Sequence, residues 1–133
     1  MNIFEIYLKK IKDLILTLNK EGVIEIPKDL NSINVDIPPQ QFDSDISTNV
    51  AMVLSKINKT NPLELAKKFE SSLMKNDTNI DKIEIVKPGF INIKFKPLFW
   101  NDFLKEIINN YKKFGINTNE VKKNYLIEFV SAN

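Results

Sequence analysis

The chain has 133 residues, of which 43% are hydrophobic and 27% charged, a composition typical of a soluble globular protein with one core. Lysine and arginine exceed aspartate and glutamate by 19 to 17, and the resulting net charge of +2 is too small to indicate nucleic-acid binding by itself. The sequence contains no Cys and no His, which excludes disulfides, thiolate metal sites, cysteine nucleophiles and histidine bases.

The first element that we predict is a helix over residues 3–20, with Gly22 placed to end it. Its apolar residues recur at the spacing of one helix face. They are Phe4, Tyr7, Leu8, Ile11, Leu14, Ile15 and Leu18. We interpret this face as part of the domain's own core. A partner helix docking on the same face is the alternative.

A short strand and two helices are predicted next. Residues 33–37 alternate in polarity and are followed by two prolines, which cannot donate to a sheet ladder. After the loop "QQFDSD", a helix is expected within "ISTNVAMVLSKINK", capped by Ser47 or Thr48. Another helix is expected in "NPLELAKKFESSLMKN", with Asn61 as its cap and Glu64 reaching back in a capping box. The residues of this helix that we expect in the core are Leu65, Ala66, Phe69, Leu73 and Met74.

Two strands over residues 82–96, joined by the turn dipeptide Pro88-Gly89, are predicted to form a hairpin. A last helix is expected over 98–114, with Gly115 as the residue after its cap. The order of elements predicts an α+β fold, with a small antiparallel β-sheet packed with about four α-helices. We divide the chain into a domain at 1–115, a linker at 116–123 and a final strand within 124–133.

The second strand of the hairpin is the best candidate for a binding surface. Side chains alternate across a sheet. If Ile91, Ile93 and Phe95 point into the core, then Phe90, Asn92 and Lys94 share the outer face. An aromatic ring can stack on an unpaired base, an amide can pair with a base edge, and a lysine attracts phosphate. From spacing alone, an ordinary sheet surface explains the same residues.

No catalytic constellation is evident in the sequence. Glu25, Glu64, Glu84 and Asp45 could form an acid–base pair only if the fold brought them together, and we interpret them as solvated carboxylates. The residues of "FDSDISTNVA" are favourable helix-start residues, which explains them as a capped loop. With three glycines in all, a glycine-rich phosphate loop is not available.

Four stretches, in this order, are similar to one family. "FDSDISTNVAMVLSK" (42–56) and "NPLELA" (61–66) resemble the loop and helices of the additional N-terminal domain of arginyl-tRNA synthetases. "KPGFINIKF" (87–95) resembles that domain's PGFIN hairpin. "IEFVSAN" (127–133) resembles the strand that leads into the HIGH signature of the class I catalytic domain. The resemblance implies that the final strand, 124–133, is the first strand of that Rossmann-type domain.

The resemblance also implies roles for particular residues. In the family, an aromatic residue and an amide two positions later contact an unpaired base in the D-loop at the tRNA elbow, which places Phe90 and Asn92 at that contact. Lys87 and Lys94 would flank it. Ser131 and Asn133 would be remnants of the arginine pocket.

Two positions depart from the family pattern. Ser44 replaces a glycine, and we expect strain in the turn if that position has a positive φ angle. Lys87 replaces the first glycine of the usual Gly-Pro-Gly start of the hairpin.

The implied function is tRNA recognition within an arginine–tRNA ligase, a cytoplasmic, monomeric enzyme. The full-length enzyme would use arginine, ATP and Mg²⁺. Residues 1–133 alone would hold no cofactor, no metal and no catalytic residue. No run approaches the roughly 18 apolar residues of a membrane span. Two alternatives are a protein-interaction or scaffold domain, docking through the first helix, and a free-standing RNA-binding module.

Overall fold

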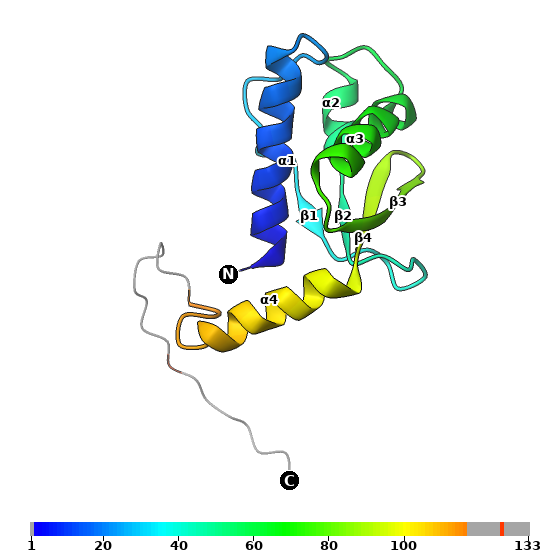
Figure 1. Ribbon diagram of the computed structural model, residues 1–133. Helices are drawn as coiled ribbons and strands as arrows, with labels where there is room; N and C mark the ends of the chain where they lie inside the picture. The colour runs from blue at the N-terminus through cyan, green and yellow to red at the C-terminus, as the bar shows by residue number, and fades with distance from the viewer. Residues whose placement is uncertain (1, 117–125, 127–133) are drawn as a thin grey trace.

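The computed structural model describes residues 2–116 and residue 126. Within them lie four helices and four strands, whose arrangement can be followed in Figure 1. The helices are α1 (Ile3–Lys20), α2 (Val50–Ser55), α3 (Pro62–Asn76) and α4 (Pro97–Asn109). The strands are β1 (Val35–Asp36), β2 (Ile46–Thr48), β3 (Ile80–Val86) and β4 (Phe90–Phe95). None of the helices described is long and apolar enough to cross a membrane.

The strands form one antiparallel sheet in the order β1-β2-β4-β3. The predicted α+β class with a small antiparallel sheet is therefore confirmed. β4 is a central strand, paired with β2 on one side and with its hairpin partner β3 on the other. The hairpin predicted around Pro88-Gly89 is also confirmed.

One hydrophobic core joins α1, α2 and α3 to the inner face of the sheet. Tyr7, Ile11, Ile15 and Leu18 of α1 are buried in it. The interpretation of the first helix as core-facing is thus confirmed. Tyr7 also reaches Asp77 beyond the end of α3, where its hydroxyl donates a 2.9 Å hydrogen bond to the carboxylate. Lys10 forms an ion pair of the same length with Asp77.

Several predicted details were wrong. Ile46–Thr48 is strand β2 and not the start of a helix, because its β-branched residues pair with β4. The residue at the cap position of α2 is Asn49, whose side chain makes no cap hydrogen bond. The prediction that Thr48 accepts from a free backbone N–H at the helix start is nevertheless confirmed, because its hydroxyl accepts a 3.3 Å bond from Val50. Met74 is 44% exposed. The helix α4 ends at Asn109, so Gly115 is not the residue after its cap.

The start of α3 agrees in part with the prediction. The side-chain oxygen of Asn61 accepts a 2.8 Å hydrogen bond from the backbone N–H of Leu63, and Pro62 occupies the first turn. The capping box does not form, since the Glu64 carboxylate accepts from the hydroxyl of Thr60.

The hairpin turn between β3 and β4 packs tightly against α2 and the start of α3. A Cβ atom added at Gly89 would lie 2.7 Å from Cβ of Pro62 in α3 and 3.0 Å from Cγ of Met52 in α2. A glycine is required here because no side chain fits. This contact fixes the position of the turn, and therefore of Phe90 directly after it.

Candidate nucleic-acid interface

The outer face of β4 carries the residues proposed to bind RNA. Ile91, Ile93 and Phe95 are buried in the core. By the alternation of a strand, Phe90, Asn92 and Lys94 therefore share the opposite face. The loop between β1 and β2 comes over this face and makes it concave.

Phe90 and Asn92 lie in one cleft of about 490 Å³. Residues from the β1–β2 loop, including Pro38 and Phe42, form part of its lining, and Lys87 of the hairpin turn contributes as well. The structure thus brings three of the predicted residues together. Such a cleft is within the range of pockets that bind small groups.

Phe90 is 38% exposed. It is the first residue of β4 and pairs with Val86, the last residue of β3. A partly exposed ring on a fixed strand can receive a flat ligand on its free surface, because little side-chain entropy is lost on binding.

Asn92 is more buried than the alternation argument suggested, with only 2% of its surface exposed. Its neighbours in the sheet are Ser47 of β2 and Glu84 of β3. The buried Oδ1 atom of Asn92 has no hydrogen-bond partner among the residues described. A buried acceptor without a partner costs the fold about 1–3 kcal/mol. This cost is understandable if a ligand in the cleft supplies the donor.

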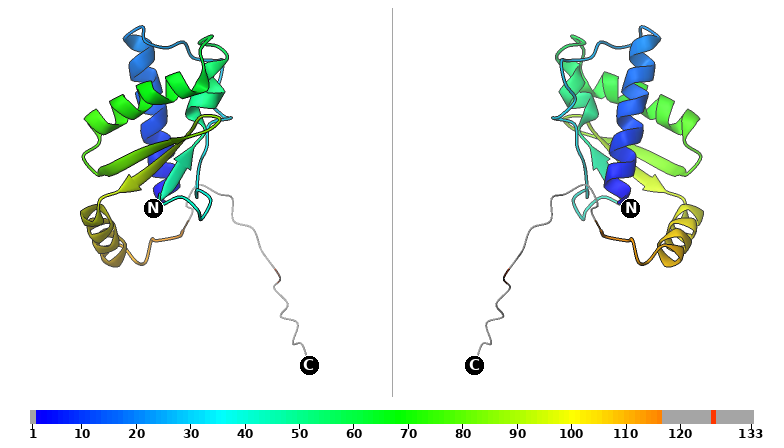
Figure 2. Two further views of the ribbon diagram at one scale, coloured as in Figure 1. Left: turned by 90° about the vertical axis from the view of Figure 1, so that its right-hand side faces the viewer. Right: turned by 90° about the vertical axis from the view of Figure 1, so that its left-hand side faces the viewer.

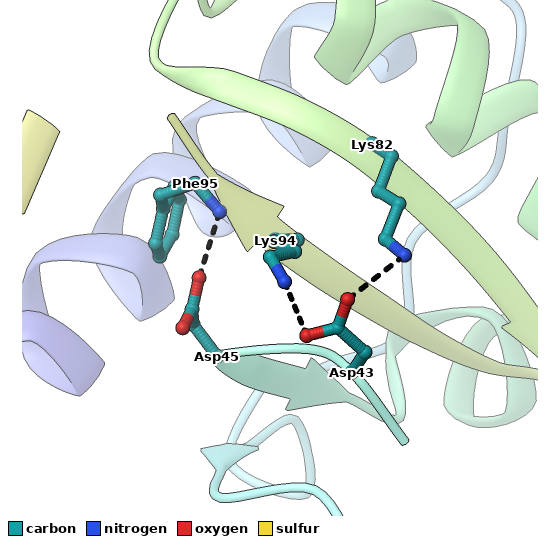
Figure 3. A network of polar contacts seen from close by, with 5 residues as sticks. All are labelled: Asp43, Asp45, Lys82, Lys94 and Phe95. Atoms are coloured by element: carbon teal, nitrogen blue, oxygen red, sulfur yellow. Dashed lines mark hydrogen bonds and ion pairs between the residues drawn. The ribbon is translucent and has the colours of Figure 1, made fainter. Parts of the chain in front are cut away.

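We expected Lys94 to be a free cation, but it is paired with a carboxylate. Its ammonium group donates to Asp43 in the β1–β2 loop, and Lys82 of β3 donates to the same carboxylate at 3.3 Å, as Figure 3 shows. Lys82 and Lys94 are directly opposite each other in the sheet, so Asp43 reduces the repulsion between them.

The ion pair between Asp43 and Lys94 shifts the pKa of both residues. The hydrogen bonds from Lys94 and Lys82 hold the pKa of Asp43 below its ordinary value. The bond to Asp43 in turn raises the pKa of Lys94. Asp43 and Lys94 therefore stay charged at neutral pH, and a phosphate would have to compete with Asp43 for the two lysines.

Asp45 fastens the same loop to the sheet. Its carboxylate accepts a 2.8 Å hydrogen bond from the backbone N–H of Phe95, and its own N–H donates to the carbonyl of Ile93 (Figure 3 shows the first). Ser44, between the two aspartates, does not have a positive φ angle. The strain considered for this serine is therefore not present, although its Oγ atom is buried without a hydrogen-bond partner.

The carboxylates considered for acid–base chemistry are held in different places. Asp45 is bonded to Phe95 and Glu64 to Thr60 at the start of α3. Glu84 lies opposite Asn92 on the sheet. Within the described part of the chain, no group of three or more Asp, Glu, His or Cys residues could hold a metal ion.

Two predicted site residues, Ser131 and Asn133, lie outside the described residues, as do the predicted linker beyond 116 and almost all of the predicted final strand. Sequence reasoning missed the contributions of Phe42 and Asp43 to the interface. An aromatic residue inside the polar loop "QQFDSD" was the signal that could have indicated a packing role for the loop.

A family model described as "Arginyl tRNA synthetase N terminal domain" matches residues 5–95. The chain belongs to this family. The matched region ends at the last residue of β4. The matched region contains all the residues that line the cleft. The PGFIN-like hairpin therefore lies within the region that is common to members of this synthetase family.

Curated relatives agree with the family assignment. An arginine–tRNA ligase of Pelagibacter ubique is 56% identical over all 133 residues. Ligases of the same name from Bartonella henselae and Staphylococcus carnosus are 38% identical over 133 residues and 36% identical over 123 residues, which is 92% of the chain. The chain spans less than a quarter of the length of these relatives, 23%, 23% and 22% respectively.

Proposed function

We propose that residues 1–115 form the tRNA-binding N-terminal domain of an arginine–tRNA ligase, and that this domain contacts an unpaired base of the D-loop at the tRNA elbow. The observation that carries the proposal is the cleft in which the half-exposed ring of Phe90 lies beside the unpartnered amide oxygen of Asn92. A splayed-out base offers a flat face and an edge with hydrogen-bond donors, which are the two features that these groups can bind.

The electrostatic contribution comes from lysines around the cleft. Lys87 lines it directly. Lys82 and Lys94 lie opposite each other, two residues along their strands from the Glu84–Asn92 pair, and share one carboxylate, that of Asp43. Asp43 offsets one of their two charges, and a phosphate would compete with it. Binding should therefore depend on salt, with a small number of phosphate contacts. The contact would be weak alone and would gain affinity through its covalent connection to other tRNA-binding surfaces of the ligase.

Catalysis is assigned to the remainder of the ligase and not to this domain. The full-length enzyme would join arginine to its tRNA with ATP and Mg²⁺, as a cytoplasmic monomer. Ser131 and Asn133 are proposed to border the arginine pocket there. The rival in which the first helix docks on another protein is disfavoured, because the apolar face of α1 is already buried in the core.

The test is steady-state aminoacylation by the full-length ligase with variants of Phe90 and Asn92. Phe90→Ala should raise KM for tRNA about 10-fold, since a stacked base contributes about 1–3 kcal/mol. Asn92→Ala should raise it by up to a similar factor, since it removes a hydrogen bond to the base edge that contributes about 0.5–1.5 kcal/mol. KM for arginine and ATP, and kcat at saturating tRNA, should change little.

Matched variants of Phe90 distinguish base stacking on an aromatic ring from a contact that needs only an apolar side chain of similar size. Phe90→Tyr keeps an aromatic ring and should retain the wild-type KM for tRNA, whereas Phe90→Leu keeps apolar bulk and should lose affinity. Leu16→Ala, at an exposed apolar residue of α1, controls for a general effect of truncation. If Phe90→Leu and Phe90→Tyr behave alike, base stacking is not the contact.

A further inference from the structure

The helix α4 has an apolar stripe that the domain covers only at its beginning. Near its start, the ring of Phe99 lies 4.5 Å from the ring of Phe95 and that of Trp100 lies 5.9 Å from it, measured between centroids. Further along, Leu104 and Ile108 are 54% and 68% exposed, and Tyr111, two residues beyond the end of the helix, is 67% exposed. None of the residues of α4 is buried.

The exposed residues continue the stripe in a regular pattern. Trp100, Leu104 and Ile108 are each four residues apart, so Leu104 and Ile108 continue the helix face on which Trp100 lies. Tyr111 follows the cap of the helix, Asn110. We name Leu104, Ile108 and the following Tyr111 the α4 stripe. The charged residues of α4 are Asp102, Lys105 and Glu106, and the first two pair with each other at 3.6 Å. A contiguous apolar row of this kind, in contrast to scattered surface leucines, indicates an interaction surface.

The position of α4 indicates what covers the stripe. The family match ends at residue 95, and α4 begins at Pro97. Figures 1 and 2 show α4 leaving the end of β4 and extending away from the sheet. More than three quarters of the length of the similar ligases lies outside the region that this chain matches. The helix thus stands between the shared N-terminal domain and any following part of a ligase.

We propose that the α4 stripe docks on the part of the ligase that follows it in the same polypeptide. This inference rests on the proposed function only in requiring that the chain belong to a longer ligase. The surface is apolar, so it fits an apolar patch of protein and not the tRNA backbone.

The size of the surface favours this occupant over a second copy of the chain. A helix of 13 residues is about 20 Å long and about 10 Å wide, so one face covers roughly 200 Å². A stable dimer generally buries about 800 Å² on each partner. A tethered contact needs less area because the two surfaces are held at an effective concentration of about 1 mM or more.

Docking of the α4 stripe would give the helix a positioning role. Anchored to the core at its start and to the rest of the ligase along the stripe, α4 would fix the distance and direction between the cleft and the reacting end of the tRNA. The contact at Phe90 could then orient the tRNA as well as bind it.

Thiol labelling of the full-length ligase without tRNA tests the proposal. Ile108→Cys places a thiol on the stripe, and Asn109→Cys places one on the next residue, which is exposed and points to another side of the helix. Labelling is followed by mass spectrometry of the peptide containing residue 108 or 109. In the ligase, we expect Cys at 108 to react at least 10-fold more slowly than Cys at 109.

The same two substitutions in the 133-residue chain, which has no cysteine of its own, provide the reference, and there the two rates should be similar. Equal rates in the full-length ligase would overturn the proposal. Protection that appears only as the protein concentration rises would also overturn it, in favour of a second copy. Because tRNA is left out, neither result depends on the contact at Phe90, which the aminoacylation kinetics test separately.

Discussion

Replacing Asn92 with leucine should make the domain more stable while it weakens tRNA binding. Leucine has nearly the shape of asparagine but no polar atoms. The substitution removes a buried Oδ1 acceptor that has no partner among the residues described, and such an atom costs about 1–3 kcal/mol. The side chain borders the cleft, so the slightly larger leucine has room. We expect a net gain of about 1–2 kcal/mol in the free energy of unfolding.

Urea and thermal unfolding of the 133-residue chain measure this gain. Trp100 is the single tryptophan, and its ring packs against that of Phe95 in the core, so its fluorescence reports loss of the fold. A gain of 1 kcal/mol corresponds to a rise in Tm of about 4 °C or more for a domain of this size. In the full-length ligase, the same Asn92→Leu substitution should raise KM for tRNA as much as Asn92→Ala does.

Ser44→Ala is the matched control. The Ser44 hydroxyl is the other buried side-chain atom without a hydrogen-bond partner in the described part of the chain, and it is not among the residues of the cleft. Its removal should stabilise the fold and leave tRNA kinetics unchanged. If Asn92→Leu destabilises the domain, the amide has a structural partner and the argument that it is reserved for a ligand is wrong.

Three further substitutions test other parts of the structure. Asp43→Asn should release Lys94 and its neighbouring lysine, so that the slope of log Kd for tRNA against log salt concentration steepens by about 1–2; an unchanged slope would show that these lysines do not meet phosphate. Burial raises the pKa of Asp77, but the hydrogen bonds from Lys10, the backbone of Asn79 and Tyr7 outweigh burial, so the net effect is a lowered pKa. The contribution of Asp77 to stability is therefore complete above the unfolded pKa of about 3.9 and is lost as the pH falls through the folded pKa. Asp77→Asn should therefore show a weaker loss of stability below about pH 4 in acid titrations followed by circular dichroism, and identical acid curves would contradict this. Gly89→Ala should destabilise the domain by about 1–3 kcal/mol in urea unfolding, because its Cβ would lie 2.7 Å from that of Pro62; a neutral effect would mean that the hairpin turn can move away from α3.

The elements that the sequence predicted well are those specified by local patterns. The apolar periodicity of α1, the Asn61 cap of α3 and the turn around Pro88-Gly89 depend on neighbouring residues, and each is present in the structure. Strand β2 was missed because Ser47, Thr48 and Asn49 have the side chains of a helix start. Its three residues form a strand because β1 and β4 lie on either side of them, and no local signal contains that information.

The candidate site shows the same division between local and tertiary information. Alternation along β4 placed Phe90 and Asn92 on the face of the strand that lines the cleft, but the expectation that both are exposed was wrong for Asn92, which is 2% exposed. It could not predict how deep Asn92 lies, because depth depends on the loop that crosses the face. It also could not predict that Asp43, 51 residues before Lys94 in the sequence, binds that lysine. Charge partners across a sheet require the fold to be known.

A double-mutant cycle between Phe90 and the D-loop tests the central claim most directly. The full-length ligase and its Phe90→Ala variant would be assayed for kcat/KM with tRNAs carrying an abasic nucleotide at each unpaired D-loop position in turn. We predict that one abasic position lowers kcat/KM for the wild-type enzyme about 10-fold or more and has little further effect on the variant, a coupling of about 1–3 kcal/mol. Additive losses at every position would contradict the account, because Phe90 would then contact no base of the D-loop.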